Sequence, residues 1–373
     1  MESPLPHDVV ELIMERLPVK SLMRSKAVSK QWQTTIESTF FKERQLKHRQ
    51  QSGDPDVLMV SVCSKPPQKE LLRTLVLGSS SSVRIPTPWE KENLHYFVSY
   101  NSCDGMVCLY HPVKSGFVVN PTTGWYRPLP VSGLQQLIID LGDSYFELGY
   151  ARTHYMLGFG KDIITGTYKA VWLYNSSELG LENATTCEVF DFTTSSWRYV
   201  TPASPYPVVG CTDPVFVDGS LHWLTVCEET THLVSFDLHT EAFQVICKAP
   251  FASSDFVDIL VCNLDNRLCV SEKKWPDQVI WSFDSGNKTW VKMFSIDLPI
   301  TVFLYDLSPR CAFPPLALLD GGKKKKKKLL FYGRVKNRSL LTLDPETQSD
   351  DVAFSAESIG TPVCYFPSLF SIE

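Results

Sequence analysis

A turn motif that recurs after short apolar runs constrains the fold of this chain more than any other feature. In each copy a strand-like run ends in Asn or Asp, a polar turn follows, and in four of five copies an aromatic residue comes next. The Asn or Asp side chain can accept hydrogen bonds from backbone N–H groups two residues on, so each copy predicts a tight hairpin. The residues at this position are Asn120, Asp191, Asp237, Asp284 and Asp344.

A second signature, a polar turn followed by a strand, precedes most copies. The runs DGMVCLY, DGSLHWL and DNRLCVSE place Gly105, Gly219 and Arg267 15 to 18 residues before the next Asn or Asp. A multi-stranded unit of about 40 to 50 residues that recurs is typical of a β-propeller blade. The 323 residues after position 50 would give six units of about 54 residues each. We therefore expect a mainly β fold with about six blades, and five blades is the alternative.

The first 50 residues follow a different pattern. The segment LPHDVVELIMERLPVKSLMRSKAVSKQWQTTIESTFFKERQL, residues 5–46, carries apolar residues at helical spacing, and Pro18 ends the first helix at Leu17. Three or four short helices in about 42 residues cannot bury enough apolar surface to be stable alone. The excess of apolar surface predicts a helical segment that docks on a second protein.

This segment also resembles the F-box, the motif that binds the adaptor Skp1. The resemblance is carried by Leu5-Pro6, Asp8, Leu17-Pro18-Val19, Lys20-Ser21-Leu22 and Val28-Ser29-Lys30-Gln31-Trp32, although Ala27 stands where the family commonly has cysteine. The resemblance implies a Skp1-binding face made of Leu5, Pro6, Val9, Ile13, Leu17, Pro18, Leu22, Val28 and Trp32. The alternative is a helical bundle that only caps the chain's own β domain.

The β region is similar to the F-box-associated interaction domain of plant F-box proteins, which is related in pattern to kelch-type propellers. The matching runs are SCDGMVCLY, VVNPTTGWYRPLP, LGFGKDIITGTYKAVWL, CEVFDFTTSSWR and VDGSLHWLT, within roughly residues 95–300. We therefore expect an F-box over residues 1–50 and a kelch-like, propeller-like substrate-binding domain over 51–373.

Together the two resemblances imply the substrate receptor of a Skp1–cullin–F-box ubiquitin ligase. Its expected partners are a Skp1-type adaptor, cullin and RING subunits reached through that adaptor, and a target protein that the sequence does not identify. Ubiquitin transfer would belong to the RING subunit and its E2 partner, so we expect no catalytic residue and no cofactor in this chain.

Composition excludes several other classes of function. A net charge of −5 argues against nucleic-acid binding, and no run approaches the roughly 18 apolar residues of a membrane span. The 11 cysteines include no C-x-x-C pair, so no metal site is expected. The first residues lack the pattern of a signal peptide. We expect free thiols in a reducing compartment, the cytoplasm and/or the nucleus.

Two features could indicate chemistry. Residues 282–290, SFDSGNKTW, fit the Asp-box of sialidase propellers, but no motif supplies the arginine cluster and tyrosine nucleophile that a sialidase needs. His222 alternates with apolar residues in SLHWL, which predicts a core histidine. A sialidase- or oxidase-like propeller enzyme therefore stays an alternative, as does a Skp1-binding scaffold that works without a ligase.

Three surface segments remain. The run Lys323–Lys328 predicts either a solvated loop between two strands or a nuclear import signal. Insertions at one face of a propeller can vary without disturbing the blades. We therefore expect the target to bind on such insertions, with residues 128–148 and 202–214 as the candidate loops.

Overall fold

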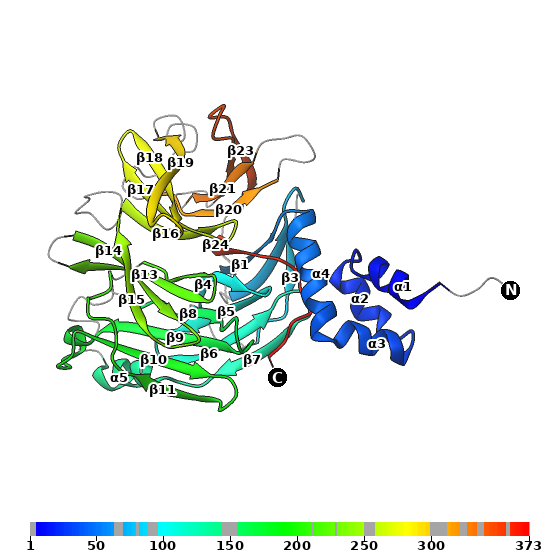
Figure 1. Ribbon diagram of the computed structural model, residues 1–373, viewed down its shortest axis with the longest axis horizontal. Helices are drawn as coiled ribbons and strands as arrows, with labels where there is room; N and C mark the ends of the chain where they lie inside the picture. Colours follow the sequence, from blue (N-terminus) through cyan, green and yellow to red (C-terminus); the bar gives the residue numbers. More distant parts are fainter. Residues whose placement is uncertain are drawn as a thin grey trace.

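The computed structural model describes residues 5–62, 70–79, 82–88, 96–142, 155–209, 212–227, 230–249, 258–298, 312–320, 327–333, 339–355 and 359–372. In this part of the chain, four N-terminal helices are followed by six antiparallel sheets of four strands each. The helices project from one side of the β-rich body (Figure 1). We refer to the four helices as the helical lobe.

The helical lobe consists of α1 (His7–Met14), α2 (Val19–Ser25), α3 (Lys30–Glu37) and α4 (Thr39–Ser52). Pro6 and Pro18 occupy the N-cap positions of α1 and α2. The Ser29 and Ser38 hydroxyls each accept a backbone N–H three residues on at 3.2 Å and so begin α3 and α4. The helix break predicted at Pro18 is therefore present, with α1 ending slightly earlier, at Met14.

Each sheet is one blade of a propeller. Blade 1 contains β24 (Ile359–Tyr365), β1 (Asp56–Val62), β2 (Glu70–Val76) and β3 (Val83–Ile85). Blade 2 contains β4 (Phe97–Cys103), β5 (Met106–His111), β6 (Lys114–Asn120) and β7 (Trp125–Leu129). Blade 3 contains β8 (Gly158–Lys161), β9 (Tyr168–Asn175), β10 (Thr185–Asp191) and β11 (Ser196–Val200).

The remaining blades repeat the arrangement. Blade 4 contains β12 (Val215–Val217), β13 (Ser220–Cys227), β14 (Thr230–Asp237) and β15 (Phe243–Lys248). Blade 5 contains β16 (Ile259–Leu264), β17 (Arg267–Lys274), β18 (Asp277–Asp284) and β19 (Thr289–Asp297). Blade 6 contains β20 (Pro315–Leu319), β21 (Lys328–Gly333), β22 (Ser339–Leu343) and β23 (Asp350–Ser355). The prediction of a mainly β chain with six blades is confirmed.

The C-terminal strand closes the ring. β24 takes the innermost place in blade 1 and pairs antiparallel with β1. Apolar side chains fill the space between each pair of neighbouring blades, so the core is divided into six wedges. The last wedge joins Val57 and Met59 of blade 1 to Leu330 and Leu340 of blade 6. Both ends of the β region are therefore needed to complete the propeller.

The predicted hairpins are present in blades 2 to 6, where they connect the third and fourth strands. In blade 4 the carboxylate of Asp237 accepts the backbone N–H groups of His239 at 2.9 Å and Thr240 at 2.7 Å. The equivalent side chains in the other four blades bond the backbone in the same way; they are Asn120, Asp191, Asp284 and Asp344. These acidic and amide residues shape turns, as expected.

The second signature forms the turn between the first and second strands. The pairs Asp104-Gly105, Asp218-Gly219 and Asp265-Asn266 all have positive φ, between 47° and 78°. Two consecutive residues of this kind form the tight turn that suits the twist of a hairpin. Gly105 has a further reason to be glycine, because a Cβ atom there would overlap the carbonyl oxygen of Phe366.

Because the strands of each blade alternate in direction, all these turns lie on one face of the propeller. The helical lobe enters on the same face, since α4 leads directly into β1, the second strand of its blade. We call this the lobe face. The opposite side, which carries the connections after the second and fourth strands, is the far face.

Two segments fix the helical lobe to the lobe face. Leu46 of α4 is buried in the wedge between blades 2 and 3. Residues 366–372, the C-terminal segment, run between the lobe and the propeller: Leu369 belongs to the apolar core of the lobe, whereas Phe370 and Ile372 belong to the wedge between blades 2 and 3. The end of the chain therefore packs against both parts.

Polar contacts hold the C-terminal segment in place. The Asn120 amide, at the blade 2 turn, donates to the carbonyl oxygens of Ser368 at 3.1 Å and Phe370 at 2.9 Å. The Ser368 hydroxyl donates to the carbonyl oxygen of Asp104 at 2.6 Å. Because Asn120 and Ser368 are both fully buried, these bonds are shielded from water and fix the path of the segment.

Candidate protein-interaction sites

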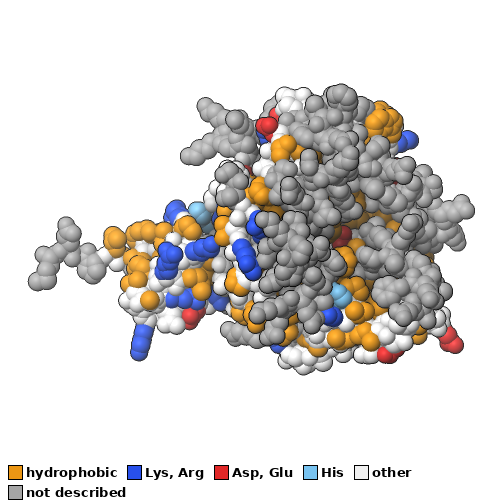
Figure 2. All heavy atoms as spheres, turned by 180° about the vertical axis from the view of Figure 1, so that it is seen from behind, with side chains coloured by type: hydrophobic (Ala, Val, Ile, Leu, Met, Phe, Trp, Pro, Cys, Tyr) orange, Lys and Arg blue, Asp and Glu red, His pale blue; other side chains and the backbone are white. Residues whose placement is uncertain are grey.

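The outer side of the helical lobe presents an apolar face to solvent. Leu5, Ile13 and Val28 are 64%, 49% and 64% exposed, and Val9 is also exposed. Figure 2 shows apolar side chains gathered on the lobe, on the side away from the propeller. Three more apolar residues of the lobe are exposed and were absent from the predicted face; they are Leu12, Met23 and Phe40.

The same helices have a separate inner face. Met14, Val19, Ile36 and Phe41 are buried and pack with Leu369 of the C-terminal segment. Helix α1 is therefore apolar on two sides, with Met14 turned inward and residues such as Ile13 turned outward. A helix that is apolar beyond its buried face has surface left for a partner.

The structure divides the predicted Skp1-binding residues into two groups. Leu5, Pro6, Val9, Ile13, Pro18 and Val28 are exposed. Leu17 and Trp32 are half-buried at the edge of the lobe core, and Leu22 is fully buried within it. The prediction for Leu22 needs correction, because its side chain stabilises the lobe from inside and is not available to a partner. The helical spacing of Leu22 did not show which side of α2 would face inward.

Charged residues border the outer face. His7 lies 3.3 Å from the Glu11 carboxylate and 3.0 Å from the Thr35 hydroxyl. Arg44 of α4 pairs with Glu11 at 3.7 Å and with Glu15. The His7–Thr35 contact joins α1 to α3, and the Arg44 pairs join α1 to α4. The Arg44 guanidinium also lies 5.1 Å from the centre of the Phe40 ring.

The far face carries an ordered helix where the sequence suggested a loop. Within residues 128–148, α5 (Gly133–Leu141) begins at a capping box in which Ser132 and Gln135 bond each other's backbone N–H groups. Figure 1 shows α5 on the side of the propeller away from the lobe. Residues 143–148 lie outside the described part of the chain.

A buried carboxylate fixes the start of α5. Glu188 of β10, which is 1% exposed, accepts the backbone N–H groups of Gly133 at 2.8 Å and Leu134 at 2.6 Å. The Tyr174 hydroxyl donates to the same carboxylate at 3.0 Å. Burial raises the pKa of Glu188, and the three hydrogen bonds oppose that rise. The two bonds from the first turn of α5 end on a side chain of β10, so Glu188 attaches α5 to blade 3.

The two predicted target-binding segments meet at one groove on the far face. The groove, of about 630 Å³, is lined by Leu137 of α5, by Tyr174, by Leu181 and residues 183–187, and by residues 199–204. It therefore brings part of segment 128–148 together with the start of segment 202–214. Leu181 and residues 183–187 also contribute, and nothing in their sequence distinguished them.

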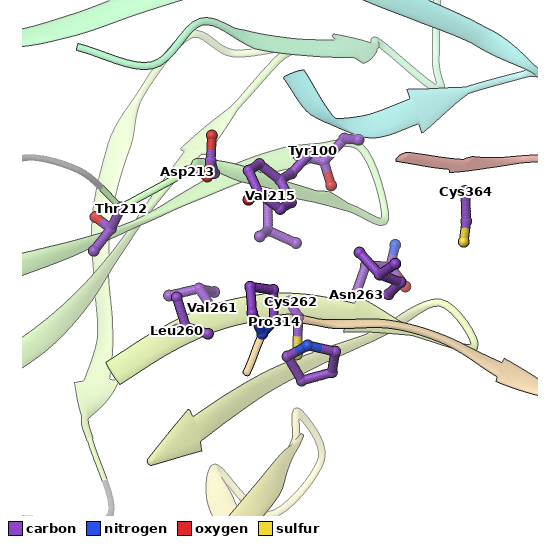
Figure 3. Close-up of a pocket in the computed structure, with 13 residues that line it drawn as sticks. Tyr100, Thr212, Asp213, Val215, Leu260, Val261, Cys262, Asn263, Pro314 and Cys364 are labelled. Atoms are coloured by element: carbon purple, nitrogen blue, oxygen red, sulfur yellow. The ribbon is translucent and has the colours of Figure 1, made fainter. Parts of the chain in front are cut away.

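The centre of the propeller holds two cavities among its described residues. The wider one, of about 290 Å³, opens toward the lobe face beside Asp104 and Asp265. The narrower one lies among the inner strands. Side chains from β4, β12, β16 and β24, among them Tyr100, Val215, Cys262 and Cys364, converge there around a cavity of about 50 Å³ (Figure 3). Such a volume suits a few water molecules, whereas small-molecule sites usually measure about 300–1,000 Å³.

In the described part of the chain, the side chains that could indicate catalysis or metal binding have structural roles instead. No group of three or more His, Cys, Asp or Glu side chains there could hold a metal ion. His222 is buried, and burial lowers its pKa to about 4, in agreement with a core position. Asp284 of the Asp-box bonds the backbone N–H groups of Gly286 and Asn287, as a turn residue. No helix in this part is long and apolar enough for a membrane span.

The lysine run lies in the connection between β20 and β21. Lys323 to Lys326 are outside the described residues, so the predicted import signal stays a prediction. Lys327 is exposed and pairs with Asp265 of the neighbouring blade, and Lys328 begins β21. This position agrees with a loop between two strands on the lobe face.

The fold defines a class of protein, a small helical lobe joined to a six-bladed propeller. Comparison with known families places the chain within that class. Residues 3–44 match the F-box domain, and residues 71–372 match the F-box associated beta propeller domain. The chain therefore belongs to the family of F-box proteins with an associated propeller. Neither matching family is described as kelch repeats, so a kelch relationship stays a prediction.

Relatives from Arabidopsis thaliana cover nearly the whole chain. F-box/LRR-repeat/kelch-repeat protein At1g09650 is 65% identical over 100% of this chain and 98% of its own length. F-box protein At5g10340 is 52% identical over 100% of this chain and 85% of its own length. F-box protein At2g34280 is 50% identical over 99% of both chains. F-box domains in general bind Skp1-type adaptors, and proteins of this family are typically non-catalytic.

Proposed function

We propose that this chain is the substrate receptor of a Skp1–cullin–F-box ubiquitin ligase, acting in the cytoplasm and/or the nucleus. The observation that carries the proposal is the exposed apolar face of the helical lobe, at Leu5, Val9 and Ile13. A Skp1-type adaptor would cover this face and connect the chain to cullin and RING subunits.

Burial of the exposed apolar side chains of the lobe could offset the free-energy cost of binding an adaptor. Full burial of one Leu, Ile or Val side chain stabilises by about 1.5–3 kcal/mol. Four or five such side chains could offset an association cost of about 4–15 kcal/mol. The exposed side chains available are those of Leu5, Val9, Leu12, Ile13 and Val28.

The propeller would hold the target, and this chain would supply proximity rather than bond chemistry. Fixing a reactant near a catalytic group can replace much of the entropy cost of their encounter. Leu46 and Leu369 fix the helical lobe to the propeller. A target on the far face would then be presented at a defined distance from the adaptor.

Affinity purification of Ile13→Asp tests the docking claim. Ile13 is half exposed and outside the lobe core, so the substitution should leave the fold intact, whereas a charge within the apolar interface is costly. We expect Skp1 and cullin to co-purify with the parent chain and to be lost from Ile13→Asp. Val291→Asp is the matched control, because Val291 is an equally exposed apolar residue on blade 5.

Each result has a definite meaning. Unchanged Skp1 capture by Ile13→Asp would refute docking through this face. Skp1 without cullin would favour a scaffold that works outside a ligase. Loss of Skp1 from Val291→Asp as well would show that the assay reports general surface damage, and Skp1 affinity would then be measured with purified proteins.

A further inference from the structure

The groove on the far face is built from fixed parts. Tyr174, Thr185 and Cys187 are buried and form its floor, whereas Leu181 and Tyr199 are exposed at its rim. The last wall is Leu137 of α5. A large open apolar groove on a propeller face is a place where a side chain from another molecule can be buried.

The α5 wall is held in position before any ligand binds. Beyond the two bonds from Glu188 and the capping box, the Gln135 amide donates to the carbonyl oxygens of His111 and Lys114, both at 2.6 Å. Leu134 and Ile138 are buried beneath the helix. A wall fixed in this way loses little conformational entropy on binding, which favours affinity.

The rim is acidic. Asp140 is exposed on α5, one turn beyond Leu137, and Glu182 is exposed between the rim residues Leu181 and Asn183. The described residues that line the groove include no Lys, Arg, Asp or Glu, so its own lining is uncharged.

From these observations we propose that the groove binds a segment of the target protein that inserts one apolar side chain and carries Lys or Arg beside it. The apolar side chain would contact Leu137, Leu181 and Tyr199, and the cations would face Asp140 and Glu182. Complementary charge of this kind gives specificity and register more than raw affinity. The role of this segment as part of a ligase target rests on the proposed function; the binding chemistry does not.

Charge also argues against a second copy of this chain as the occupant. The protein has a net charge of −5, and two acidic rims brought together would repel. A small molecule would be poorly enclosed because the groove is open. It would also be too short to reach both Asp140 and Glu182 while filling the floor. An extended peptide can reach both rim carboxylates and the floor at once.

Selection from a display library of random twelve-residue peptides tests the proposal. The bait is the full chain, both free and bound to Skp1. We expect enriched peptides to carry Lys or Arg within two or three positions of an apolar residue. Tyr199→Ala should weaken the best peptide about tenfold, measured by fluorescence anisotropy.

Charge reversal provides the sharper comparison. The double variant Asp140→Lys with Glu182→Lys should reject the basic peptides and select acidic ones. Asp277→Lys, an exposed acidic residue on the far face in blade 5, is the matched control and should keep the original preference.

Three outcomes would overturn the proposal: no enrichment, acidic peptides enriched by the parent chain, or basic peptides that bind the double variant equally well. Dimerisation of the free chain that is lost in Tyr199→Ala would instead assign the groove to a second copy. Failure of Skp1 to bind the bait would count against the proposed function alone, because the free chain still reports on the groove.

Discussion

The two faces of the propeller are built in opposite ways. On the lobe face, the short turns between the third and fourth strands of blades 2 to 6 are closed by Asn or Asp side chains. The C-terminal segment follows β24 of blade 1, bonds Asn120 of blade 2 and places Leu369 in the helical lobe. On the far face, long connections follow the blades, and one of them contains α5. In the proposed receptor, the lobe face would hold the adaptor-binding helices, and the far face would be free to vary for recognition of the target.

The largest effect should come from the contact between the two parts. Leu369→Asp would place a charge in the lobe core among Met14, Leu22 and Ile36, and an unpaired buried charge destabilises by about 3–5 kcal/mol. We expect faster hydrogen exchange in α1–α3 and weaker Skp1 capture, although Leu369 is far from the F-box in sequence. Hydrogen exchange with mass spectrometry checks this.

A neighbouring substitution controls for that prediction. Ser371→Asp adds the same charge two residues further on, at a half-buried position outside the lobe core, and should change exchange in α1–α3 little. Equal protection in Leu369→Asp and the parent chain would show that the C-terminal segment does not support the lobe.

The next effect concerns how the stability of the fold depends on pH through His222, in the core of blade 4. The pKa of His222 is about 4 in the fold because of burial, and about 6.5 in the unfolded chain. Its contribution to stability is present above pH 6.5 and is lost as pH falls toward 4, by up to about 3 kcal/mol. His222→Gln should therefore lose stability less steeply between pH 6.5 and 4 in denaturant titrations. Equal acid slopes would contradict a buried neutral imidazole.

A smaller effect is expected at a single turn of the lobe face. Asp237→Ala removes the acceptor of two backbone N–H groups, a loss of about 1–2 kcal/mol in the free energy of unfolding. Asp277→Ala, an exposed change on the far face, should alter the same quantity by less than about 0.5 kcal/mol. Urea unfolding of both variants checks this, and equal losses would mean that the lobe-face turns have no special role.

The smallest effect should be at α5 on the far face. Because burial raises the pKa of Glu188, the native chain holds that proton to a higher pH than the unfolded chain does. Stability from this group is therefore present below pH 4.5 and declines as pH rises above it. Glu188→Gln cannot titrate, so its melting temperature should rise relative to the parent chain between pH 4 and 7. A pH-independent difference would contradict the raised pKa.

The lobe face could be predicted from the sequence because its turns depend on local chemistry. Asp237 and Asn120 form turns with residues two or three positions away, and Asp218-Gly219 adopts positive φ within one hairpin. Such contacts are visible as short motifs that repeat. Even the number of blades followed from their spacing.

The interaction sites were less predictable because they depend on distant contacts. Leu22 and Ile13 are both apolar residues within short amphipathic helices, and the sequence does not distinguish them. Leu22 is buried because it packs in the lobe core with Leu369, whereas Ile13 is exposed. The groove needs Leu137 of α5, Leu181 of the connection before β10 and Tyr199 of β11, and α5 needs Glu188, more than 50 residues away. No local pattern links these positions.

Hydrogen exchange of the purified chain with and without saturating Skp1 tests the docking surface most directly. We expect slower exchange over residues 5–14 and around Val28 when Skp1 is bound, with no change over α5 or residues 181–204. Unaltered exchange over residues 5–14, or protection confined to the propeller, would contradict docking through the outer face of the helical lobe.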